Sequence, residues 1–344
     1  ENLIETHKID EKYEKYDFKD RRRNPKMKQI SIEIIHKCPN KCIHCSSYSD
    51  INCTLMIQTK KVKELIDSVV TLDTKVLSIS GGEPFLHLGL LDIVQYAKDR
   101  EVNVYIYTSG ISLNDKGQAQ SVDLKLLQKL YEAGVDKIIF DLPAIDETIY
   151  NQFMGTSGYQ KFVFESIRKV QSEGIFSEIH FVPTKLNVEE IPRVMEFAEQ
   201  EGIDRVSFLG LVPHGRATQN IKQLVLSNEE NIRVKKLLKE ISSEKMRVGI
   251  PLQLDECKAH CYAGRNKLCV RYDGKVFGCE AFKYIQLVDS EGNIVEPDSI
   301  YQKSLEDIYY RSKYLKLEQK FVADQMMNCK YTEKCPVQRM IRKN

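Results

Sequence analysis

The 344-residue sequence contains no apolar run that approaches the roughly 20 residues needed to cross a membrane. Its polar, charged beginning lacks the apolar segment typical of a signal peptide. It also lacks an excess of basic charge, since 51 lysines and arginines stand against 49 aspartates and glutamates, for a net charge of +2. Nucleic-acid-binding proteins use such an excess to neutralise phosphates. We therefore expect a soluble, cytoplasmic protein with no membrane anchor and no nucleic acid as a partner.

Cysteine is absent between residues 54 and 256, although the chain has ten cysteines. They lie at positions 38, 42, 45 and 53, and then at 257, 261, 269, 279, 329 and 335. Because no secretory signal is visible, metal or redox chemistry explains these cysteines better than disulfides do. The two separate groups predict two separate sites.

Short apolar, β-branched runs alternate with longer amphipathic segments from residue 29 to residue 211. We expect strands at 29–35, 75–80, 102–108, 137–142, 178–183 and 205–211, and helices at 60–72, 91–100, 122–134, 159–174 and 188–202. Continuous apolar runs are typical of parallel strands covered by helices. Six such repeats predict an α/β fold, either an open doubly wound sheet or a partial (β/α) barrel. In both folds, ligands bind at the carboxyl ends of the strands.

The pattern changes after residue 216. A helix is expected at 227–242, a β-hairpin around Asp273-Gly274, and one further helix at 304–321. With 42% hydrophobic residues, the chain is long enough for one large and one smaller domain. The predicted organisation has four parts: a polar N-terminal extension (1–27), the βα region (28–216), a linker helix (217–250) and a small hairpin-plus-helix domain (251–344).

The first expected strand leads directly into three cysteines, Cys38, Cys42 and Cys45, with the spacing C-x3-C-x2-C. Three thiolates on one loop can bind three corners of a four-iron cluster and leave the fourth iron open to another ligand. A zinc site completed by His44 is one alternative, and free structural thiols are another. The position of the loop, at the carboxyl end of a strand, favours the cluster.

This loop resembles the cluster-binding loop of the radical S-adenosylmethionine (SAM) enzymes. A second motif agrees with the resemblance: the turn Gly81-Gly82-Glu83-Pro84 directly follows the second expected strand. The two glycines permit close backbone approach, and Glu83 can accept a hydrogen bond from an ammonium group. The resemblance, which extends over residues 29–340, implies a partial (β/α)6 barrel in which this turn binds the methionine amino group of SAM.

The resemblance also implies that residues after the other strands contact SAM. These are Thr108, Ser109, Asp141 (toward the ribose), Thr184, Leu211 (on the adenine side) and, within the cluster loop, His44. Ser109 and Thr184 have an alternative role as ordinary turn or capping residues.

The late cysteines resemble the C-terminal extension called SPASM, or its shorter twitch form. The resemblance implies a small iron–sulfur domain with one auxiliary four-iron cluster, whose ligands would be Cys261, Cys279, Cys329 and Cys335. Cys269 and Cys257 are alternative ligands. A zinc ribbon is the competing interpretation, because four thiolates also suit zinc.

Taken together, the resemblance implies reductive cleavage of SAM to a 5′-deoxyadenosyl radical, which abstracts a hydrogen atom from a substrate. We expect a peptide-modifying oxidoreductase (a maturase), supplied with electrons by a flavodoxin or ferredoxin and assisted by a separate leader-peptide recognition protein. A small-molecule or sugar dehydrogenase is the alternative, and a non-catalytic iron–sulfur or zinc protein is a third possibility. Cys53 is a candidate hydrogen donor to a substrate radical or an ordinary thiol.

Overall fold

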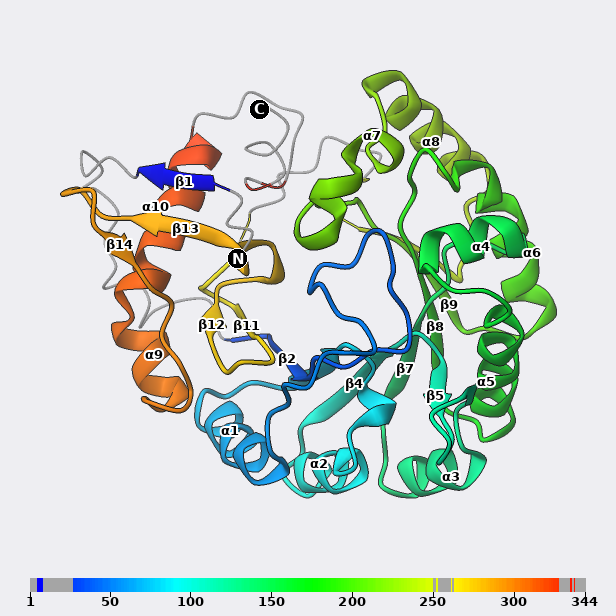
Figure 1. Ribbon diagram of the computed structural model, residues 1–344, viewed down its shortest axis with the longest axis horizontal. Helices are drawn as coiled ribbons and strands as arrows, with labels where there is room; N and C mark the ends of the chain where they lie inside the picture. Colours follow the sequence, from blue (N-terminus) through cyan, green and yellow to red (C-terminus); the bar gives the residue numbers. More distant parts are fainter. Residues whose placement is uncertain are drawn as a thin grey trace.

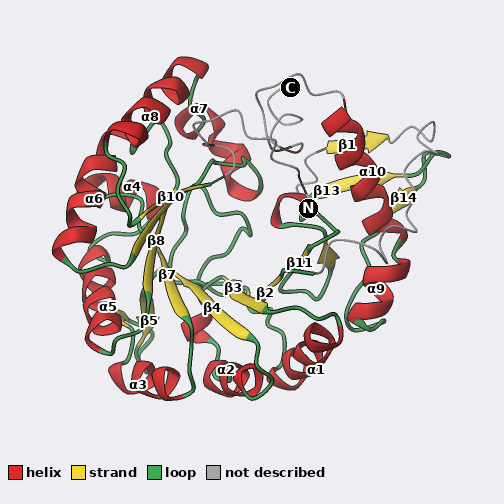
Figure 2. Cartoon of the chain, turned by 180° about the vertical axis from the view of Figure 1, so that it is seen from behind, coloured by secondary structure: helices red, strands yellow, loops and turns green. Residues whose placement is uncertain are grey.

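A computed structural model describes residues 5–8, 27–249, 252, 261, 263–327, 335 and 337. Its centre is a nine-stranded sheet with the order β10-β9-β8-β7-β4-β3-β2-β11-β12. Neighbouring strands are parallel except for β11 and β12, which pair antiparallel. The sheet curves into an open, partial barrel with helices along its outer face (Figures 1 and 2). The predicted α/β partial barrel is therefore confirmed.

The strands of this sheet are β2 (Gln29–Ile35), β3 (Val76–Gly81), β4 (Asn103–Thr108), β7 (Lys137–Asp141), β8 (Ser177–Phe181), β9 (Arg205–Phe208), β10 (Met246–Val248), β11 (Lys267–Val270) and β12 (Val276–Phe277). The outer helices are α1 (Thr59–Thr71), α2 (Leu90–Lys98), α3 (Leu124–Glu132), α5 (Gln160–Ser172) and α6 (Ile191–Gln200). All six strands and five helices predicted for the βα region are present. They form because one face of the strands is apolar and packs against the apolar stripe of each helix. The opposite face carries buried polar residues such as Ser78, Glu178 and Ser207.

Local signals fix where several of these helices begin and end. Asp123 caps α3 by accepting a hydrogen bond from the Lys125 N–H. Gly134 and Gly174 have positive φ values of 81° and 70° directly after α3 and α5, as expected of glycines that end helices. Pro192 lies in the first turn of α6, where its missing N–H costs no helical hydrogen bond.

Several elements were not predicted from the sequence. They are the hairpin of β5 (Ile111–Leu113) and β6 (Ala119–Ser121), the helices α4 (Glu147–Met154) and α7 (Ile221–Leu224), and the strands β1 (Glu5–Lys8), β10, β13 (Ile285–Val288) and β14 (Ile294–Val295). Short 3-10 turns are η2 (Pro84–Leu86), η3 (Val188–Glu190), η4 (Gly215–Asn220) and η6 (Glu280–Phe282). Helix α8 (Asn228–Glu240), predicted at 227–242, begins at a capping box made by Ser227 and Glu230.

The single helix predicted at 304–321 is wrong, because the structure has two helices there. These are α9 (Leu305–Arg311) and α10 (Lys313–Met327). Ser312 lies between them with an extended ψ of 123°, and its hydroxyl accepts a hydrogen bond from the Leu315 N–H. A serine that caps the next turn in this way competes with continuation of the preceding helix.

The C-terminal segment, from residue 261 onward, is joined to the barrel by strand pairing. The predicted hairpin around Asp273-Gly274 is present as β11 and β12, and β11 adds to the barrel sheet beside β2. A second, smaller sheet with the order β1-β13-β14 lies against α10 (Figure 1). The C-terminal segment has a separate apolar core around Phe277, Phe282 and Tyr314. In the described part of the chain, no helix is long and apolar enough to span a membrane.

Candidate active site

The loop after β2 that carries Cys38, Cys42 and Cys45, the cysteine loop, lies inside the curve of the sheet (Figure 1). Cys38 is buried, and Cys42 and Cys45 are half-buried; all three are free thiols. Burial raises the pKa of Cys42 well above its usual range, and the charges of Cys38 and Cys45 raise it further, which shows that the three groups are electrostatic neighbours. Such thiols give up their protons when a metal supplies the compensating positive charge.

The spacing of these groups differs from that of a single-ion site. Among the described residues, no three His, Cys, Asp or Glu side chains converge closely enough to hold one metal ion. In a four-iron cluster each cysteine binds a different iron, so the thiols need only surround the cluster. His44, the alternative zinc ligand, instead donates from Nε2 to Asp141 Oδ2 at 3.0 Å.

Helix α4 holds one side of the cysteine loop. The Lys41 and Ile43 N–H groups donate to the Met154 and Phe153 carbonyls at 3.1 and 2.9 Å. Gly155, which ends α4 with φ 64°, lies so close to the Lys41 carbonyl that a Cβ there would clash with it. The backbone of the loop is therefore fixed by a helix that the sequence pattern did not reveal.

Arg216, in η4, holds the other side of the same loop. Its buried guanidinium donates to the Cys42 and Ser49 carbonyls, both at 2.7 Å, and its N–H donates to the Cys45 carbonyl at 2.8 Å. Arg216 lies five residues after Leu211, which the resemblance places on the adenine side. No local signal in the sequence indicated that the guanidinium fixes the cysteine loop, because the partners are about 170 residues away in the chain.

The Gly81-Gly82 turn packs against the start of the cysteine loop. The Gly82 and Glu83 N–H groups donate to the Ile35 and Lys37 carbonyls at 2.6 and 2.9 Å. A Cβ at either glycine would clash with these backbones, and Gly81 has a positive φ of 141°. Only glycine allows this approach. Pro84 follows at the start of η2.

The Glu83 carboxylate is fully buried at the end of this turn. One of its oxygens accepts from the Thr108 hydroxyl at 2.7 Å and the Phe85 N–H at 3.2 Å. The other accepts from the Ser109 N–H at 2.8 Å and the Ser109 hydroxyl at 2.6 Å. Burial raises the pKa of Glu83, while these four hydrogen bonds lower it. The structure thus joins Glu83, Thr108 and Ser109, all predicted SAM contacts, into one network.

The remaining predicted SAM contacts lie around the same loop. Asp141, at the end of β7, pairs with His44, whose ring packs against Phe153 with 4.6 Å between ring centroids. Thr184 is buried, and its hydroxyl donates to Asn187 at 2.9 Å within a tight turn. Leu211 packs in a small apolar cluster that includes Ile43 of the loop.

Three late cysteines lie together in the C-terminal segment. The charges of Cys279, Cys261 and Cys335 all act on Lys267 and, with Glu280, raise its pKa against the opposing effect of burial. Cys269 is different, because its electrostatic neighbours are Glu280, Glu33 and Lys283 rather than other thiols. Two further candidate ligands, Cys257 and Cys329, lie outside the described residues.

Cys53 lies on the segment that leaves the cysteine loop. Its sulfur is 3.6 Å from His36 Nε2 and 3.6 Å from Asp50 Oδ1. Burial raises the pKa of this thiol. Its contacts are therefore with the flank of the loop.

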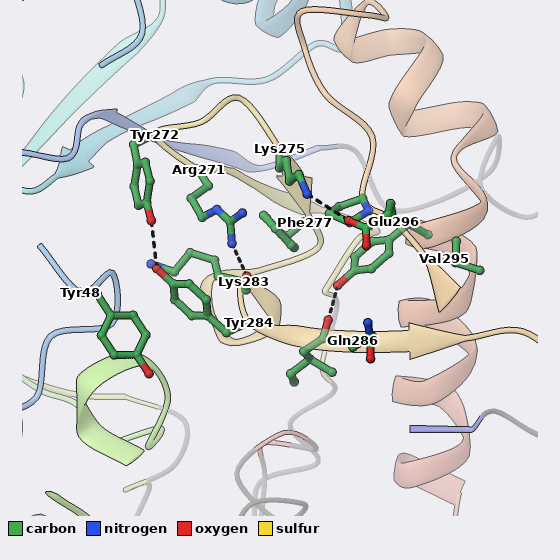
Figure 3. A pocket seen from close by; sticks show the side chains of 13 residues that line it. Tyr48, Arg271, Tyr272, Lys275, Phe277, Lys283, Tyr284, Gln286, Val295 and Glu296 are labelled. Carbon is green, nitrogen blue, oxygen red and sulfur yellow. Dashed lines mark hydrogen bonds and ion pairs between the residues drawn. The ribbon is translucent and has the colours of Figure 1, made fainter. Parts of the chain in front are cut away.

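An aromatic pocket of about 450 Å³ lies where the loop meets the C-terminal segment (Figure 3). Its wall includes Tyr48 from the loop, and Tyr272 and Tyr284 from the C-terminal segment. Tyr272 also stacks on His36, with ring centroids 3.6 Å apart and an interplanar angle of 4°. This pocket was not predicted from the sequence, because its two sides are more than 200 residues apart.

Comparison with known proteins agrees with this geometry. Residues 32–198 match the sequence model of the radical SAM superfamily. Residues 32–198 therefore form a radical SAM domain, as the cysteine loop and the glycine turn predicted.

Two curated relatives show how far the similarity extends. The chain is 29% identical over 226 residues to the Fe-coproporphyrin III synthase of Methanosarcina barkeri, a match covering 65% of this chain and 54% of that protein. It is 23% identical over 242 residues to the PqqA peptide cyclase of Granulibacter bethesdensis, covering 70% of this chain and 62% of that protein. The matches thus span less than two thirds of either relative.

Solved structures share the fold at low sequence identity. Streptococcus suis SuiB bound to S-adenosylmethionine superposes with a TM-score of 0.65 at 16% identity, covering 85% of this chain and 68% of that one. Native anSMEcpe with bound AdoMet gives a TM-score of 0.61 at 13% identity, covering 85% and 84%.

Proposed function

We propose that the protein binds a four-iron cluster at Cys38, Cys42 and Cys45 and uses it to cleave SAM and modify a peptide. The observation that carries the proposal is the placement of three free thiols on one loop whose backbone is hydrogen-bonded to the glycine turn at the strand ends. The donor set suits the cluster, since three thiols leave one iron for SAM. When bound, such a cluster supplies the electron that converts SAM into a radical able to abstract a hydrogen atom.

The chain's own residues bind and orient the reactants in this proposal. Gly81 and Gly82 let the turn pack directly against the start of the cysteine loop, which would bring it beside the methionine end of SAM, and Glu83 holds Thr108 and Ser109 next to this turn. The Asp141 carboxylate pairs with His44 and is partly exposed, so it would be available to accept hydrogen bonds from the ribose. Leu211 would contribute an apolar surface on the adenine side. Thr184 would act from its turn with Asn187.

Two proteins similar to this chain support a peptide substrate. One is a PqqA peptide cyclase, and SuiB has been crystallised with its precursor peptide SuiA. A small-molecule substrate is the second candidate, because another relative is an Fe-coproporphyrin III synthase. On either substrate, an external donor such as a flavodoxin or ferredoxin would supply electrons, and a separate leader-recognition protein could deliver a peptide.

An auxiliary four-iron cluster is part of the proposal. Cys261, Cys279 and Cys335 lie together and would supply three ligands. Cys329 would be the fourth. Cys269 is the weaker choice, because its thiol lies among Ser31, Glu280 and Lys283.

Anaerobic turnover with labelled substrates tests the substrate class. Precursor-like peptides of about ten residues should transfer deuterium from the target C–H into 5′-deoxyadenosine, because contacts remote from the target position it. Transfer from a labelled polyol, sugar or porphyrin, with none from any peptide, would contradict the peptide assignment.

A further inference from the structure

Lys283 is a lysine of the C-terminal segment whose ammonium lies in the interior of the protein. Its side chain is 0% exposed. The ammonium donates to Glu33 Oε1 at 2.5 Å, to Ser47 Oγ at 2.6 Å and to Ser46 Oγ at 3.0 Å. All three donor positions of the ammonium are therefore used. Glu33 belongs to β2, whereas Ser46 and Ser47 belong to the cysteine loop.

The two serines directly follow Cys45, the third cysteine of the loop. The Ser47 N–H lies 3.4 Å from the Cys45 sulfur, and its hydroxyl also donates to Glu33 at 2.5 Å. The ammonium thus connects the flank of the loop to the strand from which the loop began. Its partners are 236 to 250 residues away in the chain.

The backbone of Lys283 is held by the hairpin of β11 and β12. Arg271 donates to the Lys283 carbonyl at 2.5 Å (Figure 3). Its guanidinium also forms a two-bond pair with Asp273. Glu280, at the start of η6, accepts from Ser31 of β2 at 2.5 Å. The position of the ammonium is therefore set by the fold of the C-terminal segment.

Burial of an ammonium is costly unless it is paired and fully hydrogen-bonded. Burial lowers the pKa of Lys283, but the charge of Glu33 raises it above the usual range, so the group stays protonated. The contact between the Lys283 ammonium and Glu33 would by itself be enough to neutralise the Glu33 carboxylate. The two contacts with the serine hydroxyls are additional, and both lie on the cysteine loop.

We propose that Lys283 is a positioning residue through which the C-terminal segment holds the flank of the cysteine loop in the conformation that retains the cluster. This inference rests on the proposed function. It assigns a role to a residue that binds no metal and that lies far from the radical SAM motif in the sequence.

The test measures how fast a ferrous chelator removes iron from the reconstituted protein. The phase that belongs to the loop cluster is identified by its absence in the variant with Cys38, Cys42 and Cys45 all replaced by Ala. Lys283→Met should accelerate this phase about tenfold or more, since hydrogen bonds to a charged donor are lost. Lys303→Met is the matched control, because it removes an exposed lysine paired with Asp298 and should leave the rate unchanged.

Two further variants separate positioning from charge neutralisation. Ser46→Ala with Ser47→Ala keeps the Lys283–Glu33 pair and should accelerate iron loss as Lys283→Met does. Lys283→Met with Glu33→Gln leaves no unpaired buried charge, and should still lose iron quickly. Wild-type retention in either double variant would overturn the inference. Failure of the proposed function would look different, because the triple cysteine variant would then hold as much iron as the wild type.

Discussion

Replacement of Glu83 by Gln should destabilise the carboxyl end of the barrel. The Glu83 carboxylate accepts the Phe85 N–H on one oxygen and the Ser109 N–H on the other. Gln has one oxygen only, so in either orientation its NH2 group faces one of these two N–H donors. The Thr108 and Ser109 hydroxyls can turn to become acceptors, but the two backbone N–H groups cannot.

The expected cost follows from these contacts. One hydrogen bond to a charged acceptor is lost, worth about 1.5–3 kcal/mol, and a buried N–H is left without an acceptor. Because Glu83 is 0% exposed, water cannot replace the acceptor. We expect the free energy of unfolding to fall by about 3 kcal/mol, and the affinity for SAM to fall as the Thr108–Ser109 segment loses its support.

Urea unfolding of the metal-free protein measures the stability, and equilibrium binding of SAM to the reconstituted protein measures the affinity. Glu132→Gln is the control, because Glu132 is an exposed residue of α3. Unchanged stability in Glu83→Gln would show that the buried network has been misjudged. Reduced stability with unaltered SAM affinity would show that the network does not support SAM binding.

Three other predictions test separate parts of the account. Arg216→Met should lower the free energy of unfolding by about 3 kcal/mol, because two charge-assisted hydrogen bonds to loop carbonyls are lost; urea unfolding against the exposed control Arg311→Met checks this. His214 is buried, which lowers its pKa from 6.5 to about 4, so stability is present above pH 6.5 and is lost as the pH falls toward 4. Between pH 7 and 5 the loss is about 2 kcal/mol, and a His214→Gln variant with the same pH dependence as the wild type would refute it. Cys279→Ala should halve the iron content after reconstitution, and full retention would exclude this auxiliary ligand.

The parts predicted from sequence were those that depend on nearby residues. The apolar runs located the barrel strands, and Gly134 and Gly174 marked helix ends, because periodicity and backbone freedom are local properties. The cysteine spacing and the Gly81-Gly82 turn likewise indicated the site from short segments. The break at Ser312 was missed, because the same apolar pattern continues on both sides of it.

The parts not predicted join segments that are distant in the chain. The His44–Asp141 pair spans 97 residues, and the Lys283–Glu33 pair spans 250. Hydrophobic periodicity carries no information about such pairs, because they form only when distant segments pack together in the folded protein. The strand pairing of β11 with β2, which brings Lys283 to the cysteine loop, belongs to the same class.

The central claim is that Cys38, Cys42 and Cys45 hold the cluster that cleaves SAM. The most direct measurement is 5′-deoxyadenosine formed from SAM after anaerobic reconstitution and reduction. The wild type should form it, and the variant with all three cysteines replaced by Ala should form none while it keeps the auxiliary iron, about half of the total. Formation of 5′-deoxyadenosine by the triple variant, or zinc in place of iron in the wild type, would contradict the account.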